Sequence, residues 1–184
     1  MPGGPGGRHR DPEPSAWVAK WAGLVRPGGT VLDVAAGAGR HARHLLGRGF
    51  RVVAADIDVS ELGDLAGRPD CEVVKADLEN APWPFPGRRF EGIVVTNYLC
   101  RTILPILVDS LTPGGVYIHE TFMQGNERFG RPSKPEFLLA PGELLERVRG
   151  RLTVAAYEAG ETAQPPAMRQ RIAAIDAPSA RLVA

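Results

Sequence analysis

The sequence has little cysteine, no long apolar run and almost no net charge, and each shortage narrows the possible classes of protein. The two cysteines, Cys71 and Cys100, form no C-x-x-C pair, so neither a disulfide framework nor a metal site is indicated. No apolar run approaches the roughly 20 residues that cross a membrane, and the N-terminus lacks the hydrophobic segment of a signal peptide. We therefore expect a cytoplasmic protein without a membrane partner.

The charge and length favour a single globular domain. A formal net charge of +1 and a pI near 7.9 give no sign of a broad nucleic-acid-binding surface. Residues 1–13 are rich in glycine and proline and lack apolar side chains, so we predict a disordered N-terminal arm there. The remaining residues, 14–184, are predicted to form one domain.

The apolar pattern alternates between strands and helices. The strands are continuous apolar runs, which is typical of buried parallel strands, so βαβ units and a doubly wound α/β sheet follow. Two final strands, 152–157 and 168–175, leave no room for a helix between them and should pair as an antiparallel hairpin at the sheet edge. The earlier strands are predicted over 30–34, 51–55, 71–75, 91–96 and 116–119, and the helices over 15–24, 40–46, 60–65, 101–111 and 141–148.

The most informative segment is the glycine-rich turn between the strand at 30–34 and the helix at 40–46. Gly37 and Gly39 permit a tight turn close to a ligand, and the helix that follows offers free N–H groups. Gly37 to Ala42 also matches the G-x-G-x-x-G/A pattern of dinucleotide sites. Asp33 favours S-adenosylmethionine (SAM) instead, because a carboxylate repels a pyrophosphate but attracts a sulfonium and an ammonium.

These features resemble the class I SAM-dependent methyltransferases over roughly residues 15–176. The resemblance implies a Rossmann-like, mostly parallel seven-stranded sheet that ends in an antiparallel hairpin. Within the family, the chain is similar in size to small bacterial tellurite-resistance and thiol methyltransferases. Asp33, Gly37 and Gly39 match the first motif, whereas Ala35 replaces a glycine often found there.

The resemblance also implies roles for further residues around the cofactor. Asp56 would accept both ribose hydroxyls, Ile57 would pack on the adenine, and Asp77 would meet the adenine amino group. S-adenosylhomocysteine would be the product. The expected cofactor-binding residues are Asp33, Ala35, Gly37, Gly39, Arg40, His41, Asp56, Ile57, Asp77, Leu78 and Asn97.

The sequence has no sharp catalytic motif. Methyl transfer from a sulfonium mainly needs alignment of the reactants and exclusion of water, so none is required. We select Tyr98, Arg101 and Glu120 as candidates, since ligands of open α/β sheets bind beyond the carboxyl ends of the strands. Tyr98 would contact the substrate or only pack on SAM. Glu120 would act as a base, bind a cation or anchor a loop, and Arg101 would bind an anionic acceptor or cap a helix.

The leading hypothesis is a SAM-dependent methyltransferase that acts on a small molecule. Methylation of RNA or protein stays open because of the arginine-rich arm, and so does SAM binding without catalysis. A dinucleotide-dependent oxidoreductase is the alternative from another class, on the strength of the glycine pattern. The acceptor, the oligomeric state and a lid role for residues 123–141 are left open.

Overall fold

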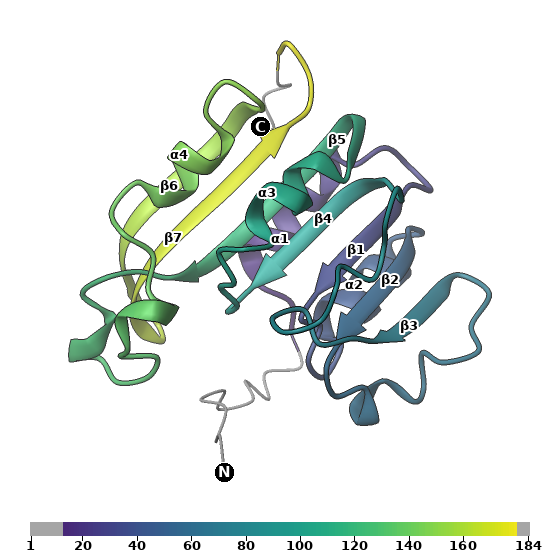
Figure 1. Cartoon of the computed structure of the whole chain (residues 1–184), viewed down its shortest axis with the longest axis horizontal. Helices are drawn as coiled ribbons and strands as arrows, with labels where there is room; N and C mark the ends of the chain where they lie inside the picture. Colours follow the sequence, from purple (N-terminus) through teal and green to yellow (C-terminus); the bar gives the residue numbers. More distant parts are fainter. Residues whose placement is uncertain (1–12, 180–184) are drawn as a thin grey trace.

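The computed structural model describes residues 13–179. Of the arm predicted over residues 1–13, all but Glu13 lies outside the described residues, as do residues 180–184. The described chain forms a twisted sheet with helices on both faces (Figure 1).

Within residues 13–179 the strands form a seven-stranded sheet in the order β3-β2-β1-β4-β5-β7-β6. The first five strands of this order pair in parallel, whereas β7 runs antiparallel to both β5 and β6. The predicted doubly wound sheet and its C-terminal antiparallel hairpin are thereby confirmed. The strands are β1 Thr30–Val34, β2 Arg51–Asp56, β3 Cys71–Lys75, β4 Phe90–Thr96, β5 Leu111–Phe122, β6 Thr153–Ala163 and β7 Pro166–Ile175.

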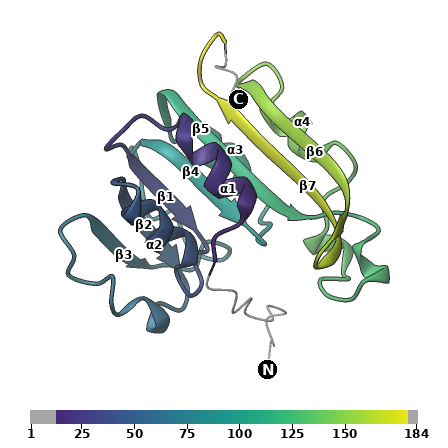
Figure 2. The same ribbon diagram turned by 180° about the vertical axis from the view of Figure 1, so that it is seen from behind.

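Short helices cover the two faces of the sheet. Figure 1 shows α3 and α4 in front of the sheet, and Figure 2, from behind, shows α1 and α2 on the opposite face. Ser15 caps α1, since its side chain accepts from the backbone N–H groups of Trp17 and Val18. The α-helices are α1 Ala16–Trp21, α2 Arg40–Gly47, α3 Leu104–Asp109 and α4 Glu143–Val148; 3₁₀ turns span Ala22–Leu24, Ser60–Leu62, Asn126–Arg128 and Pro135–Phe137.

Each face of the sheet carries its own apolar core. Trp17, Leu45 and Ile118 are buried on the α1 and α2 side, whereas Leu107 and Leu144 are buried on the α3 and α4 side. Successive side chains of a strand point to opposite faces, so a strand covered on both faces must be apolar throughout. This explains why the parallel strands are continuous apolar runs.

The structure corrects the predicted boundary between α3 and β5. The predicted helix over 101–111 is confined to Leu104–Asp109, and β5 begins at Leu111 instead of residue 116. Leu111 already pairs with Phe90, and the ladder then shifts register before it resumes at Val116. The Pro-Gly-Gly segment between these pairs has a sequence typical of a turn, but it lies within the strand as an irregularity.

The long segment 123–141 is folded and attached to the hairpin. The side chain of Asn126, which is buried, donates to the carbonyl of Pro132 at 2.9 Å and accepts from the backbone N–H of Met168 at 3.0 Å. An isolated β-bridge joins Met123 to Leu139 and closes the base of the segment. These contacts therefore pack the segment against the protein beside the carboxyl end of β5.

Candidate active site

The carboxyl ends of the five parallel strands meet at one edge of the sheet, and Figure 1 shows the arrowheads of β1, β2, β3 and β4 there. The residues that follow these strands are hydrogen-bonded to one another through the backbone. The N–H of Ala36 donates to Ala55, and the N–H of Asn97 donates to Glu120. The fold thus brings the predicted site residues to one edge, which is where ligands of open α/β sheets bind.

The turn from β1 to α2 has three residues with a left-handed backbone. Ala35 has φ 54°, Gly37 has φ 55° and Gly39 has φ 76°. A Cβ on Gly39 would lie 2.5 Å from a methyl group of Leu62, so this glycine is required by packing. A Cβ on Gly37 would meet no atom within 4 Å. Gly37 therefore presents bare backbone to open space, as a ligand-binding turn requires.

Asp33 lies buried below this turn, with only 1 % of its surface exposed. One carboxyl oxygen, Oδ2, is buried and has no hydrogen-bond partner. Burial raises the pKa of Asp33 to about 7, against the opposing effects of the Ala42 backbone N–H and the Arg40 cation. A buried, unpartnered oxygen of this kind is a good site for a cationic ligand group.

Asp56 connects the ends of β2 and β1. Its Oδ2 accepts from the N–H of Gly37 at 2.7 Å, and its Oδ1 accepts from the N–H of Asp58 at 2.9 Å. The next residue, Ile57, is 60 % exposed although it is strongly apolar. An acceptor-only carboxylate next to an exposed apolar side chain suits the hydroxyl-bearing and flat parts of a nucleoside.

Asp77 and Leu78 follow β3, but both make contacts within the protein. Asp77 Oδ1 accepts from the N–H groups of Glu79 and Asn80 at 3.0 and 2.9 Å, and these bonds lower its pKa. Leu78 is buried in the core on the α3 side. In the described structure Asp77 therefore caps its own turn.

His41 joins three elements at this edge. It is 2 % exposed; its Nε2 accepts from the N–H of Ser15 at 3.2 Å, and its Nδ1 lies 3.3 Å from Thr96 Oγ1. Burial and the nearby Arg40 lower the pKa of His41 to about 3, so the ring is neutral. Arg40 itself donates to the carbonyl of Glu13 at 3.2 Å. His41 thus fixes the starts of α1 and α2 against the end of β4.

Arg101 is occupied by the protein. Its guanidinium binds both carboxyl oxygens of Glu143 at 2.8 and 2.9 Å, and it also donates to the carbonyls of Glu136 and Leu138. Burial would raise the pKa of Glu143, but hydrogen bonds from Arg101, the Ala140 N–H and other donors lower it to about 2. Arg101 therefore anchors segment 123–141 to α4.

Glu120 and Tyr98 lie on opposite faces of the sheet. Glu120 is buried; it accepts from Ser15 Oγ at 3.1 Å and pairs with Arg171 Nε at 2.6 Å. The hydroxyl of Tyr98 is buried without a partner, and burial raises the pKa of Tyr98. Glu120 thus anchors α1 and β7 to β5, while Tyr98 packs among the side chains of the α3 side.

Sequence reasoning missed the polar run of β7. Arg169 and Gln170 are both buried at the carboxyl edge, and Arg169 Nη1 donates to Asn97 Oδ1 at 2.7 Å. Asn97 has φ 53°, a conformation that asparagine tolerates better than most residues. The signal was three consecutive polar residues, Arg169 to Arg171, within an otherwise apolar strand. Buried polar residues in such a strand need a specific reason.

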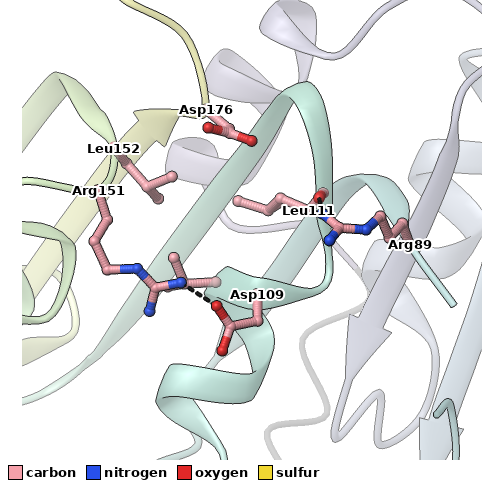
Figure 3. A pocket seen from close by; sticks show the side chains of 7 residues that line it. Arg89, Asp109, Leu111, Arg151, Leu152 and Asp176 are labelled. Atoms are coloured by element: carbon pink, nitrogen blue, oxygen red, sulfur yellow. Dashed lines mark hydrogen bonds and ion pairs between the residues drawn. The ribbon is translucent and has the colours of Figure 1, made fainter. Parts of the chain in front are cut away.

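Hollows lie at opposite edges of the sheet in the described structure. One of about 360 Å³ lies at the opposite edge of the sheet, where Asp109 pairs with Arg151 and Arg89 donates to the carbonyl of Leu111 (Figure 3). The other, of about 140 Å³, lies over the β6–β7 hairpin and is lined by Arg169 among others. The smaller hollow is the one that borders the site.

Residues 13–179 contain neither a metal-ion cluster nor a membrane-spanning helix. No group of three or more His, Cys, Asp or Glu side chains is arranged to hold a metal ion there. No helix in the same range is long and apolar enough to cross a membrane.

Comparisons with known proteins agree with this geometry. Residues 31–115 match the family described as a methyltransferase domain. Haemophilus influenzae TehB has a similar fold, with a TM-score of 0.68 and 19% identity over 84% of this chain and 59% of TehB. The chain therefore spans less than two thirds of TehB. No curated protein sequence matches the chain.

Two other solved structures share the fold. The Burkholderia thailandensis 1,6-didemethyltoxoflavin-N1-methyltransferase, solved with S-adenosylhomocysteine, gives a TM-score of 0.63 and 20% identity over 86% of this chain and 75% of its own. The Bradyrhizobium japonicum N-methyltransferase NodS gives a TM-score of 0.63 and 16% identity over 88% of this chain and 83% of NodS. Residues 31–115 therefore match the methyltransferase-domain family, and the described chain has the fold of solved methyltransferases.

Proposed function

We propose that this protein transfers a methyl group from SAM to a small-molecule acceptor, and that residues 14–184 act as one domain. The observation that carries the proposal is the β1–α2 turn, which combines bare backbone at Gly37 with a buried, unpartnered carboxyl oxygen on Asp33. A glycine-rich turn alone would also suit a dinucleotide. A buried carboxyl group below it favours a ligand with positive charge at this point.

The residues at the strand ends fit the remaining parts of SAM. Asp56 would hold the ribose hydroxyls, and exposed Ile57 would cover the adenine. Burying Ile57 against a ligand would remove apolar surface from water, which stabilises a complex by about 25 cal/mol per Å². Asn97 and Arg40 lie at the same edge and complete the set proposed to hold the cofactor.

When bound, SAM supplies a methyl group that its sulfonium has already activated. This chain's residues then need to orient the acceptor and exclude water. His41 and His119 are both buried, and each has both ring nitrogens in contact with a protein group. We therefore assign neither histidine as a general base, and propose an acceptor that is nucleophilic without one.

The shared fold does not by itself require methyl transfer. A solved structure of similar fold, with a TM-score of 0.63, is the [4+2]-cyclase SpnF. Binding of SAM without transfer is thus the second candidate function. A transfer assay with radiolabelled SAM and a panel of thiols, amines, metalloid oxyanions and carboxylic acids separates the two.

The first test is ligand-dependent thermal unfolding with SAM, S-adenosylhomocysteine and NADH, each added separately. A ligand that binds only the folded state stabilises it by about 2.7 kcal/mol at a hundredfold excess over its dissociation constant. We expect a shift with both adenosyl ligands and a much smaller one in Asp56→Asn. Asp70→Asn is the matched control, because Asp70 pairs with Arg68 before β3, away from the site. A shift with NADH alone would contradict the proposal.

A further inference from the structure

A buried arginine lies beside the proposed cofactor site. Arg169 is 7 % exposed and stands in β7 opposite Phe122, the last residue of β5. Since β7 is antiparallel to β5, the start of β7 lies at the carboxyl edge of the sheet. The contact between Arg169 and Asn97 places the guanidinium where β4 ends.

This guanidinium has no hydrogen-bonded carboxylate within residues 13–179. Its Nη1 donates to the neutral amide oxygen of Asn97, and its central carbon lies 4.1 Å from the centroid of the Phe122 ring. The carboxylate of Glu120 is 3.8 Å away. Glu120 is already engaged by Arg171 at 2.6 Å and by the Ser15 hydroxyl. The positive charge of Arg169 is thus poorly compensated.

Burial of a charged group is costly unless a close counter-ion compensates it, and the Glu120 contact is long and shared with Arg171, so a ligand anion would reduce this cost. Burial lowers the pKa of Arg169, opposed by Glu120 and reinforced by the cations Arg171 and Arg40. Within the described residues, Nε and Nη2 of Arg169 make no hydrogen bond. Both atoms retain some solvent access, since neither is among the fully buried, unpartnered atoms. Two adjacent donors of the planar fork are therefore available to a ligand.

The hollow of about 140 Å³ gives these donors an approach. Arg169 and Arg171 line it, together with two carboxylates that already have partners. Glu158 contacts Arg171 at 3.3 Å, and Glu161 contacts Arg128 at 2.9 Å. The hollow thus contains an arginine fork that no carboxylate at its rim neutralises.

We propose that Arg169 binds a carboxylate or phosphate group of the methyl acceptor and so selects an anionic substrate. The planar guanidinium matches the two oxygens of such a group in a bidentate pair. This inference rests on the proposed function, since it names the acceptor class of the same site. The α-carboxylate of SAM has the same chemistry, so the experiment must separate the two sources.

The cofactor arm uses isothermal titration of wild type and Arg169→Met with S-adenosylhomocysteine and with 5′-methylthioadenosine, which lacks the amino-acid carboxylate. We expect both dissociation constants to change by the same small factor, because the lost contact with Asn97 affects both ligands and no hydrogen bond to the cofactor carboxylate is removed. If Arg169→Met weakens only S-adenosylhomocysteine, Arg169 serves the cofactor and the inference is wrong. If wild type binds neither ligand, the proposed function itself fails.

The acceptor arm uses protein saturated with S-adenosylhomocysteine and four anionic probes: acetate, benzoate, inorganic phosphate and phenyl phosphate. Benzamide is the neutral counterpart of benzoate. We expect at least one anion to bind, and Arg169→Met to weaken it by roughly tenfold to a hundredfold, the usual effect of losing a hydrogen bond between charged groups. Arg149→Met, which removes an exposed arginine that does not line the hollow, should leave binding unchanged.

Two results would overturn the inference while the proposed function stands. One is binding of S-adenosylhomocysteine by wild type with no preference for any of the four anions. The other is an anion that binds equally well to Arg169→Met. If Arg169→Met does not fold, Arg169→Lys keeps the charge but loses the planar fork. That variant should retain benzoate binding at a level between wild type and none.

Discussion

At the β1–α2 turn, Ala35 has a strained backbone and Asp33 has a buried carboxyl group. Ala35 holds a left-handed backbone without being glycine, and Asp33 holds a carboxyl group where water cannot reach it. Neither arrangement favours folding, and both concern the turn at which we place the ligand. Costs of this kind are typical of functional sites and can be measured.

Replacement of Ala35 by glycine should stabilise the protein. A left-handed backbone costs an alanine about 1–2 kcal/mol, whereas the extra freedom of glycine in the unfolded chain costs about 0.5–1 kcal/mol. We expect Ala35→Gly to gain up to about 1 kcal/mol in urea denaturation. Ala36→Gly, at a buried neighbour without positive φ, should instead lose stability. A loss of stability in both variants would contradict the assigned strain.

Asp33 should make the stability of the free protein depend on pH. Its pKa is raised from 3.8 unfolded to about 7 folded, so the folded state binds the extra proton between these values. The stabilising contribution is complete below pH 4 and is lost as pH rises to 7. Each pKa unit corresponds to about 1.4 kcal/mol.

Comparison of wild type with Asp33→Asn by thermal unfolding from pH 4 to 8 isolates this contribution. The variant should gain stability relative to wild type as pH rises, and it should bind SAM more weakly. A stability difference that stays constant across this range would show that Asp33 has an ordinary pKa.

At the scale of elements, Arg101 is one of the residues that hold segment 123–141 in place. Arg101→Met would leave the Glu143 carboxylate, whose side chain is 11% exposed, without its bidentate partner. We expect a loss of about 1–3 kcal/mol in urea denaturation at pH 7 and faster proteolysis within the segment. Arg147→Met, which removes the exposed second partner of Glu143, should cost less than about 0.5 kcal/mol. Equal effects of the two variants would contradict the anchoring role.

The elements most clearly predicted from sequence were those with continuous apolar runs. The strand predicted over 51–55 agrees with β2 to within one residue, because burial of Val52 to Ala55 on both faces leaves an unambiguous pattern. The start of β5 was missed since Pro113 and Gly114 are normally signals of a turn. Only the pairing of Leu111 with Phe90 draws that segment into the sheet. Pairing between residues that are distant in the chain produces no local sequence pattern.

The candidate site residues likewise differ in whether a local sequence pattern indicates them. Asp33, Gly37 and Asp56 could be selected as candidates because the pattern of strand end and glycine turn is local in sequence. Arg101 was selected as a candidate, but its partner Glu143 is 42 residues away and could not be inferred. Arg169 was missed because its environment depends on the order of the strands.

At the scale of the whole molecule, the balance of charge argues for a small acceptor. A protein that contacts several RNA phosphates shows strongly salt-dependent binding, and a formal net charge of +1 gives little support for that. We expect no RNA binding at 50 mM salt in a filter assay, with or without SAM. Tight binding that weakens steeply between 50 and 200 mM salt would revive RNA as the acceptor.

The antiparallel placement of β7 has a consequence for how new specificities arise. It brings the start of β7 to the carboxyl edge formed by β1 to β5. The part of the site proposed to bind the cofactor and the part proposed to bind the acceptor are therefore encoded by separate stretches of sequence. The hairpin Thr153–Ile175 can therefore be exchanged between homologues as one unit. A chimaera of this kind should keep the nucleotide preference of one parent and take the substrate range of the other.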